Sequence, residues 1–168
     1  MYIYLRKAQY HETDQMGIIH HSNYVKWMEE ARIGYMDQMG FSYKKVEELG
    51  VISPVVEISV SYKKQVSFDD EIEIRVSIKK YNGISLEFNY EFFNRTKNEI
   101  CTTAYSRHCF LKDGRLISVK KTIPELDHAI SDCMGSKTEH TGKDPGHYRC
   151  TFCHGRIVFF PGTAETAG

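Results

Sequence analysis

The sequence predicts an α+β fold in which a curved antiparallel sheet wraps around one long helix. Two observations support this fold class. The longest segment with helical apolar periodicity covers residues 24–39, and it is apolar around most of its girth. Short segments that alternate between apolar and polar side chains follow it, with turn residues between them. A helix that is apolar on most sides needs protein around it, and a meander of strands can supply that cover.

The chain begins with an expected strand and a loop that leads to the helix. Residues 2–10 are rich in aromatic and aliphatic side chains, which favour a strand. Residues 11–21 contain the polar residues and the glycine of a loop. The side-chain oxygen of Ser22 or Asn23 can cap the helix N-terminus, and Gly40 can end the helix in a left-handed conformation.

The expected helix carries large apolar side chains one turn apart. This stripe consists of Tyr24, Met28, Ala31 and Tyr35. The apolar surface is widened by Val25, Trp27, Ile33, Met36 and Met39. A narrow polar face is left to Lys26, Glu29, Glu30 and Asp37. The helix is therefore expected either between layers or inside a strongly curved sheet.

After the helix, the apolar pattern changes to period two. Residues 43–50 first predict a short helix that ends at its glycine. Strands are expected over residues 55–66, 71–80, 84–94, 100–111 and 116–119. Turns are expected at Asp69-Asp70, Asn82-Gly83, residues 96–98 and Asp113-Gly114, with Asn82-Gly83 as a type I′ hairpin. Pro124 opens the last expected helix, over residues 125–133.

The composition narrows the class of protein. A length of 168 residues suits one domain, and 22 basic and 22 acidic residues give zero net charge. This balance argues against a nucleic-acid-binding surface. We also expect no membrane span and no signal peptide, because the apolar runs are short and the first residues lack a cleavage pattern. Five irregularly spaced cysteines indicate reduced thiols, so the expected location is cytoplasmic.

The predicted folded domain covers residues 1–134, and residues 135–168 form a tail of different composition. The tail is rich in Gly, Thr, Lys and His, and we expect it to be disordered or loosely docked. It contains one metal-like cluster, made of His147, Cys150, Cys153 and His154. The two cysteines have the spacing of half a zinc site, but a second well-spaced pair is missing, so no metal site is predicted.

The pattern Asp14-x-x-Gly17-x-x-x-His21-x-x-Tyr24 places a carboxylate on the loop just before the long helix. A helix N-terminus offers unpaired backbone N–H groups and a partial positive charge. A carboxylate beside N–H groups that can hold an oxyanion is a minimal site for acyl transfer. Asp14 is therefore the first candidate catalytic residue. The alternative is that it only hydrogen-bonds its own loop, as aspartate often does in turns.

Together with Tyr10 and Thr13 ahead of it, this pattern resembles the signature of the hotdog-fold acyl-CoA thioesterases. The resemblance is to the 4-hydroxybenzoyl-CoA thioesterase and YbgC-like branch, and it covers about residues 4–125. It implies a hotdog fold, in which the sheet wraps around a central helix. It also implies that Asp14 acts as nucleophile or general base, and that the backbone N–H near His21 polarises the thioester carbonyl.

The resemblance implies roles for further residues. The His21 side chain is a second catalytic candidate, which could orient water or donate to the leaving thiolate; the alternative is that it merely packs. Gly17 would let the thioester approach the backbone closely. The acyl group would be held by Tyr24, Trp27 and Met28, although the last two also suit the core. Candidate partners of the CoA phosphates are Lys63, Lys64 and Arg107. Rival carboxylates on the helix are Glu29 and Glu30.

The sequence therefore predicts an acyl-CoA thioesterase that releases a free acid and coenzyme A and needs no cofactor. Two alternatives stay open. An acyl-carrier protein could supply the thioester, or the protein could bind acyl-CoA without catalysis. Because a hotdog subunit leaves a strand edge and a sheet face open, we expect at least a homodimer. The resemblance also allows a homotetramer.

Overall fold

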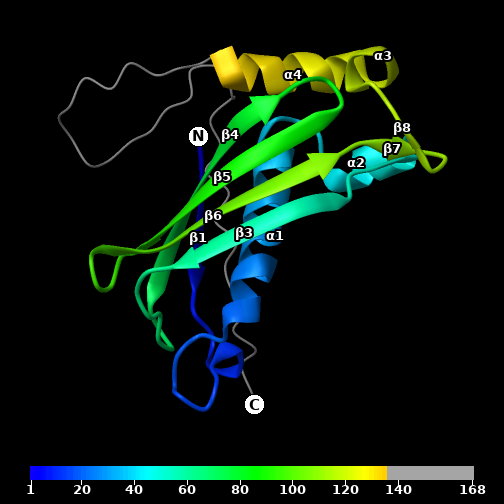
Figure 1. The fold of residues 1–168 in the computed structure, drawn as a ribbon. Coiled ribbons are helices and arrows are strands. Elements are labelled where there is room, and N and C mark those ends of the chain that lie inside the picture. Colours follow the sequence, from blue (N-terminus) through cyan, green and yellow to red (C-terminus); the bar gives the residue numbers. More distant parts are fainter. Residues whose placement is uncertain (136–168) are drawn as a thin grey trace, which may run out of the picture. The chain divides into compact units, whose positions relative to one another are not determined.

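The computed structural model describes residues 1–135, whose largest element is a five-stranded antiparallel sheet (Figure 1). The strand order is β1-β4-β5-β6-β3. These strands are β1 (Tyr2–Lys7), β3 (Val55–Tyr62), β4 (Glu71–Tyr81), β5 (Ser85–Asn94) and β6 (Glu99–Cys109). Strands β4, β5 and β6 pair in sequence order, so they form the predicted meander.

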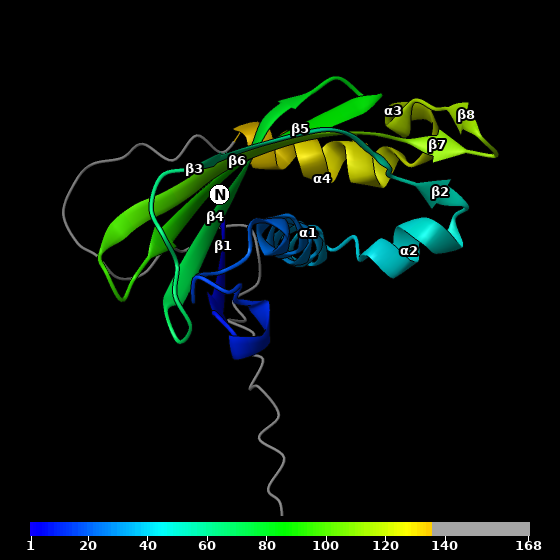
Figure 2. The same cartoon turned by 60° about the horizontal axis from the view of Figure 1, so that its bottom comes forward.

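Helix α1 (His21–Gln38) lies against one face of this sheet. Figure 2 looks nearly along the helix and shows the sheet curving over it. The predicted stripe from Tyr24 to Tyr35 is buried, and so are Trp27 and Met36. The predicted combination of a curved antiparallel sheet and one covered helix is confirmed.

Smaller elements complete the described residues. They are the 3₁₀ turn η1 (Tyr10–Glu12), α2 (Tyr43–Glu48), β2 (Val51–Ile52), β7 (Leu111–Lys112), β8 (Arg115–Leu116), α3 (Val119–Thr122) and α4 (Pro124–Gly135). Strands β2, β7 and β8 form a small second sheet. The hydroxyl of Tyr81, the last residue of β4, donates to Asp127 Oδ1 at 2.7 Å and ties α4 to the end of the main sheet.

The core follows the period-two pattern of the central strands. On β4, Ile72, Ile74 and Val76 are fully buried. They face α1 together with every second residue of β5: Leu86, Phe88, Tyr90 and Phe92. Alternation alone therefore identified the inner face of both strands.

Two predictions near the start of α1 are wrong. The first strand ends at Lys7, and Tyr10 belongs to η1, because the Glu12 carboxylate accepts the Gln9 N–H at 2.8 Å and starts a turn there. The helix cap is neither Ser22 nor Asn23. The helix begins at His21, two or three residues earlier than those caps would allow, and the His20 side chain accepts the Ser22 N–H.

The hairpin predictions differ in outcome. Asp113 and Gly114 have φ values of 51° and 73°, as the predicted tight turn requires. Asn82 is not left-handed, so the predicted type I′ turn is wrong. Its side-chain oxygen instead accepts the N–H groups of Ile84 and Ser85, at 2.9 and 2.7 Å, and this closes a longer loop.

The last predicted strand, residues 116–119, is also shorter than expected. Strand β8 ends at Leu116, and Val119 begins α3 with its side chain fully buried. The Val119 N–H donates to the Gly83 carbonyl at 2.7 Å, which draws the chain away from the β7–β8 hairpin.

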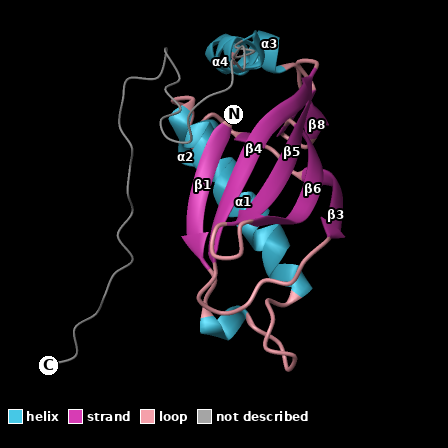
Figure 3. Ribbon diagram, turned by 90° about the vertical axis from the view of Figure 1, so that its left-hand side faces the viewer, coloured by secondary structure: helices cyan, strands magenta, loops and turns pink. Residues whose placement is uncertain are grey.

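Strand β3 is an edge of the main sheet (Figure 3), and several of its apolar side chains are exposed. Val55, Val56 and Tyr62 are each about half exposed, and Ile58 is 38% exposed. A bulge between Val55 and Glu57 interrupts the period-two alternation of this strand at Val56. Within residues 1–135, the outer backbone groups of β3 are therefore unpaired and lie beside exposed apolar side chains.

Within residues 1–135, no helix has the length and hydropathy to cross a bilayer. Helix α4 includes Gly135, the first residue of the predicted tail. The predictions for the rest of the tail, including the pair Cys150 and Cys153, lie outside the described residues.

Candidate functional site

The loop that carries Asp14 is closed by its own backbone. The Asp14 N–H donates to the Ile18 carbonyl at 2.8 Å, and the Gly17 N–H donates to the Asp14 carbonyl at 3.0 Å. Gly17 has a φ of +72°, a conformation that glycine adopts without steric cost. One carboxylate oxygen of Asp14, Oδ1, accepts the Met16 N–H at 2.8 Å. Among the described residues, no partner is recorded for the other oxygen, Oδ2.

Residues 62–67 run beside this loop and hold it against the sheet. The Ile19 N–H donates to the Val66 carbonyl at 2.8 Å, and Ile18 forms a bridge with Ser67. The Tyr62 hydroxyl donates to the His21 carbonyl at 3.1 Å. The Asp14 loop, the start of α1 and the end of β3 therefore meet at one place.

The first turn of α1 leaves one N–H group open. The Ser22 N–H donates to His20 Nδ1 at 3.3 Å, and the Asn23 N–H donates to the His20 carbonyl at 3.0 Å. For the His21 N–H, no acceptor is recorded within the part of the chain that the structure describes. The His21 side chain is exposed, with its ring 4.1 Å from that of His20. The open N–H is a donor at the positive end of the helix.

Glu12 is a buried carboxylate that the sequence analysis missed. It is only 7% exposed. Its oxygens accept from Arg6 Nη2 at 2.6 Å, from the Gln9 N–H at 2.8 Å and from the indole N–H of Trp27 at 2.8 Å. These donors come from β1, the following loop and α1, so one side chain joins the elements around the site.

The backbone of Glu12 also holds the start of α1. Its carbonyl accepts the His20 N–H at 2.9 Å and the Asn23 side-chain amide at 2.8 Å. Asp14 is two residues away on the same loop. A recognisable signal was present, because Gln9 and Glu12 have the spacing of a capping box and form one.

The candidate acyl-binding residues are mostly buried in this single chain. The Tyr24 ring is 3% exposed and lies 5.1 Å from the rings of both Trp27 and Tyr62. Burial raises the pKa of the Tyr24 hydroxyl. Trp27 is fully buried, held by Glu12 and by the Arg6 guanidinium 4.2 Å above its ring. Met28 lies one turn beyond Tyr24, at the wall of a cavity.

The structure separates the candidate CoA-binding cations. Lys63 and Lys64 directly follow β3, and both backbone N–H groups donate to the Cys101 carbonyl at 2.9 Å. Their side chains are exposed, and the segment that carries them continues to Val66 and Ser67, which contact the Asp14 loop. Arg107 instead lies on the sheet face opposite α1, where it pairs with Glu57 at 3.1 Å.

The rival carboxylates on α1 point to different places. Glu30 accepts from Arg6 Nη1 at 2.7 Å, on the β1 side of the helix. Glu29 lies at the cavity beside β3. Within residues 1–135, no three His, Cys, Asp or Glu side chains converge as metal ligands would.

His108 is a buried histidine on β6, and it faces the part of α1 that carries Arg32. It is 2% exposed, and Nε2 lies 2.8 Å from the Ser106 hydroxyl oxygen. Burial, and secondly the Arg32 guanidinium, lower the pKa of His108 from 6.5 to about 4. The imidazole is therefore neutral at neutral pH.

This shift predicts a loss of stability in mild acid. As pH falls from 6.5 towards 4, unfolded His108 takes up a proton that the folded state does not bind. The free energy of unfolding should fall by roughly 2 kcal/mol between pH 7 and 4.5 from this group. In His108→Gln, urea unfolding should show a flatter pH dependence over this interval. The exposed His11→Gln variant is the control, and an unchanged slope in His108→Gln would contradict the prediction.

Comparison with known proteins gives a consistent set of relatives. Residues 8–130 match the model of the thioesterase-like superfamily. YneP of Bacillus subtilis, named as a candidate acyl-CoA thioesterase, is 37% identical over 121 residues, which are 71% of this chain and 87% of YneP. YbgC of Escherichia coli, an acyl-CoA thioester hydrolase, is 30% identical over 88 residues, which are 52% of this chain and 66% of YbgC.

A solved structure shows the same arrangement of sheet and helix. It is a DHNA-CoA thioesterase from Staphylococcus aureus, with 34% sequence identity and a TM-score of 0.77. The match covers 80% of this chain and 91% of that protein.

Proposed function

This chain belongs to the thioesterase-like superfamily and is a hotdog-fold acyl-CoA thioesterase by homology, and on that premise we propose that Asp14 supplies the reacting carboxylate. The overall reaction is hydrolysis of a thioester to a free acid and coenzyme A. The observation that carries the proposal is the meeting of the Asp14 loop with the N-terminus of α1, where the His21 N–H has no acceptor among residues 1–135.

In this proposal, the two groups have different tasks. The His21 N–H donates to the thioester oxygen and stabilises the negative charge that develops there. Oδ1 of Asp14 stays bonded to the Met16 N–H, which fixes the carboxylate, while Oδ2 faces the reaction. That oxygen either attacks the carbonyl carbon or takes a proton from the attacking water. The thiolate of coenzyme A leaves in both routes. In the first route, water then hydrolyses the anhydride between the acyl group and Asp14, which frees the acid and restores the carboxylate. We assign protonation of the thiolate to the His21 side chain.

The substrate lies along the end of β3. The exposed side chains of Lys63 and Lys64 suit the phosphates of coenzyme A, because their segment leads from the end of β3 to Ser67, which bridges the Asp14 loop at Ile18. Tyr24 and Met28 mark the path of the acyl group along α1. Trp27 supports this path from behind through Glu12. Arg107 lies on the other sheet face and would reach coenzyme A only in another subunit.

The test is hydrolysis of a panel of thioesters by the purified protein, with free thiol as readout. The panel contains short aliphatic, long aliphatic and aromatic acyl-CoA, together with the same acyl groups on acyl-carrier protein. We expect turnover of at least one acyl-CoA. Turnover restricted to the carrier protein would change the carrier but keep the chemistry. Tight binding without any turnover would contradict the proposed reaction.

We further propose that a second copy of the chain covers the β3 edge. Among the described strands, β3 pairs only with β6, and its outer edge is free. The exposed side chains there are Val55, Val56, Ile58 and Tyr62. An unprotected apolar edge strand readily pairs with another strand. Two-fold pairing would make the protein at least a homodimer.

The Val56→Lys variant tests this interface. A charged side chain in the paired edge should convert the dimer to monomer in light-scattering or sedimentation measurements. Leu5→Lys is the matched control, because Leu5 is 51% exposed on β1, the opposite edge of the sheet. A monomeric wild-type protein, or loss of the dimer only in Leu5→Lys, would contradict the proposed interface.

A cytoplasmic location is proposed on chemical grounds. Cys101 and Cys109 carry free thiols in the structure. Free thiols persist in a reducing compartment.

A further inference from the structure

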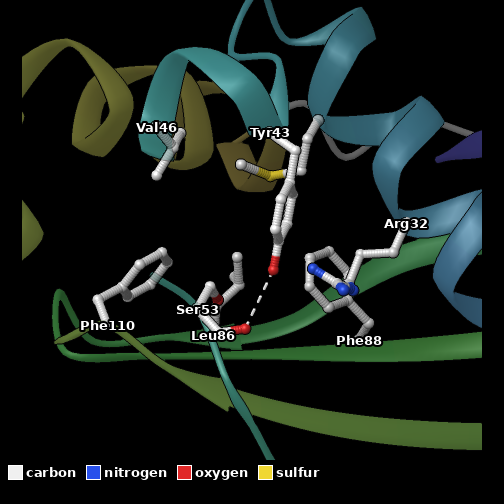
Figure 4. A pocket seen from close by; sticks show the side chains of 8 residues that line it. Arg32, Tyr43, Val46, Ser53, Leu86, Phe88 and Phe110 are labelled. Carbon is white, nitrogen blue, oxygen red and sulfur yellow. Dashed lines mark hydrogen bonds between the residues drawn. The ribbon is translucent and has the colours of Figure 1, made fainter. Parts of the chain in front are cut away.

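A cavity of about 70 Å³ lies between α1 and strands β3, β5 and β6, farther along α1 than the Asp14 loop and open towards the β3 edge. Its apolar walls include Val25, Met28 and Ile58. One water molecule needs about 10–15 Å³ of such space, so the cavity admits several waters or a small organic group. A second hollow of about 10 Å³ lies on the other side of Arg32, beside Tyr43 and Phe88 (Figure 4), and has room for about one water.

One wall of the larger cavity is a chain of buried polar side chains. The Tyr90 and Ser106 hydroxyl oxygens are 3.0 Å apart, and the Ser106 oxygen is 2.8 Å from His108 Nε2. All three residues are at most 3% exposed. Because the imidazole is neutral, this chain can both donate and accept hydrogen bonds.

Arg32 supplies a buried positive charge at the same cavity. It is 5% exposed, and its guanidinium lies 5.0 Å from the Tyr43 ring. Within residues 1–135, the carboxylate recorded as its ion-pair partner is Glu29, at 3.9 Å. That distance is too long for a hydrogen bond, and the Glu29 side chain is 63% exposed. A guanidinium this deep gains much from an oxygen acceptor inside the cavity.

We propose that the cavity binds the far end of the acyl group, and that this end carries an oxygen substituent, either a hydroxyl or a carboxylate. This inference rests on the proposed function, because it names the acyl group of the same thioester. Arg32 donates to the oxygen, and Ser106, backed by Tyr90 and His108, forms its second contact. Val25, Met28 and Ile58 cover the carbon skeleton.

The register of the sheet sets the length that such an acyl group must span. Tyr62, which reaches the His21 carbonyl, lies opposite Thr102 on β6. Ser106 is four residues farther along, roughly 13 Å at the rise of a β-strand. A long acyl group can cover this distance from the helix N-terminus of its own chain. In a two-fold β3 pair, the helix N-terminus of the second copy would approach the Val55 end instead, and a short acyl group would suffice.

Matched pairs of thioesters test the proposal. One pair is benzoyl-CoA and 4-hydroxybenzoyl-CoA, and the other is decanoyl-CoA and 10-hydroxydecanoyl-CoA. Sebacoyl-CoA adds the terminal carboxylate. Values of kcat/KM are measured for the wild type, Ser106→Ala and Arg32→Met, with Ser77→Ala on β4 as the control serine. Affinities for the same ligands are measured calorimetrically with Asp14→Asn, with and without Ser106→Ala, so that this arm needs no turnover.

The wild type should favour the oxygen-bearing member of at least one pair by tenfold or more, since a site built to hydrogen-bond a group rejects the analogue without it. Ser106→Ala should reduce that ratio to about threefold or less, while Ser77→Ala keeps it. A preference within the long pair would indicate that the acyl group comes from the helix N-terminus of its own chain, and a preference within the aromatic pair that it comes from that of the second copy. Comparison of sebacoyl-CoA with 10-hydroxydecanoyl-CoA will show whether the site prefers a carboxylate or a hydroxyl. If Arg32→Met does not fold, Ser106→Ala and the binding arm decide. Equal affinity and equal kcat/KM within every pair would overturn the proposal, whereas absent turnover with a retained binding preference would refute only the proposed reaction.

Discussion

Asp14→Asn should lower kcat by at least a hundredfold while the protein stays folded, because general acid–base groups contribute about 10²- to 10⁴-fold. Asparagine is almost the same size, and its side-chain oxygen can still accept the Met16 N–H. The loop therefore keeps its geometry, and only the charge and the basicity are lost. Steady-state thiol release and thermal unfolding are measured side by side.

Asp69→Asn is the matched control for this substitution. Asp69 is an exposed turn residue with a φ of 73°, paired with exposed Lys7 at 2.7 Å. Asparagine tolerates this conformation, and exposed ion pairs contribute little to stability. Its kcat should stay within about twofold of wild type. Equal activity of wild type and Asp14→Asn would shift attention to Glu29, the carboxylate beside the cavity.

Glu12→Ala should have the largest effect on stability among the substitutions considered. It removes the acceptor for Arg6, for the Gln9 N–H and for the Trp27 indole. Breaking a buried ion pair typically costs 3–5 kcal/mol, and Arg6 keeps Glu30 as a second partner, so we expect about 3 kcal/mol. Urea unfolding measures this loss. The activity should fall as well, because Glu12 holds both the Asp14 loop and the start of α1.

Glu30→Ala tests whether the burial of Glu12 causes the large loss of stability expected in Glu12→Ala. Glu30 binds the same guanidinium at 2.7 Å, but its side chain is 44% exposed. A surface ion pair is typically worth about 0–1 kcal/mol. We expect a much larger loss of unfolding free energy and of kcat in Glu12→Ala than in Glu30→Ala. Similar losses in both variants would contradict it.

The parts of the fold that follow from local pattern could be predicted from the sequence. Alternation placed Ile72, Ile74 and Val76 on the inner face of β4, and helical spacing placed Tyr24 and Tyr35 against the sheet. The periodicity within one segment identifies the buried face of that segment, without information from the rest of the chain. The motif likewise placed Asp14 on a loop ahead of α1, since the loop and the helix are adjacent in sequence.

The remaining features depend on contacts between distant segments. Glu12 is buried only because Arg6 on β1 and Trp27 on α1 converge on it, whereas a lone glutamate in a loop is expected at the surface. Asn82 could form a type I′ turn or accept hydrogen bonds with its side chain. The Asn82-Gly83 dipeptide is compatible with both, so the sequence did not distinguish them. The different position of Arg107 could have been predicted from the sequence, because strand alternation places its side chain and that of Ser106 on opposite faces of the sheet.

The most direct test is a single-turnover experiment with excess protein and one labelled acyl-CoA that the wild type hydrolyses. Free thiol and free acid are both followed after rapid quenching, and binding of the same thioester is measured for wild type and Asp14→Asn. The wild type should release both products, and a thiol burst ahead of the acid would identify Asp14 as the nucleophile. Asp14→Asn should bind the thioester with similar affinity and release neither product at a comparable rate. Formation of thiol and acid by Asp14→Asn at the wild-type rate would contradict the assignment of Asp14 as the reacting carboxylate.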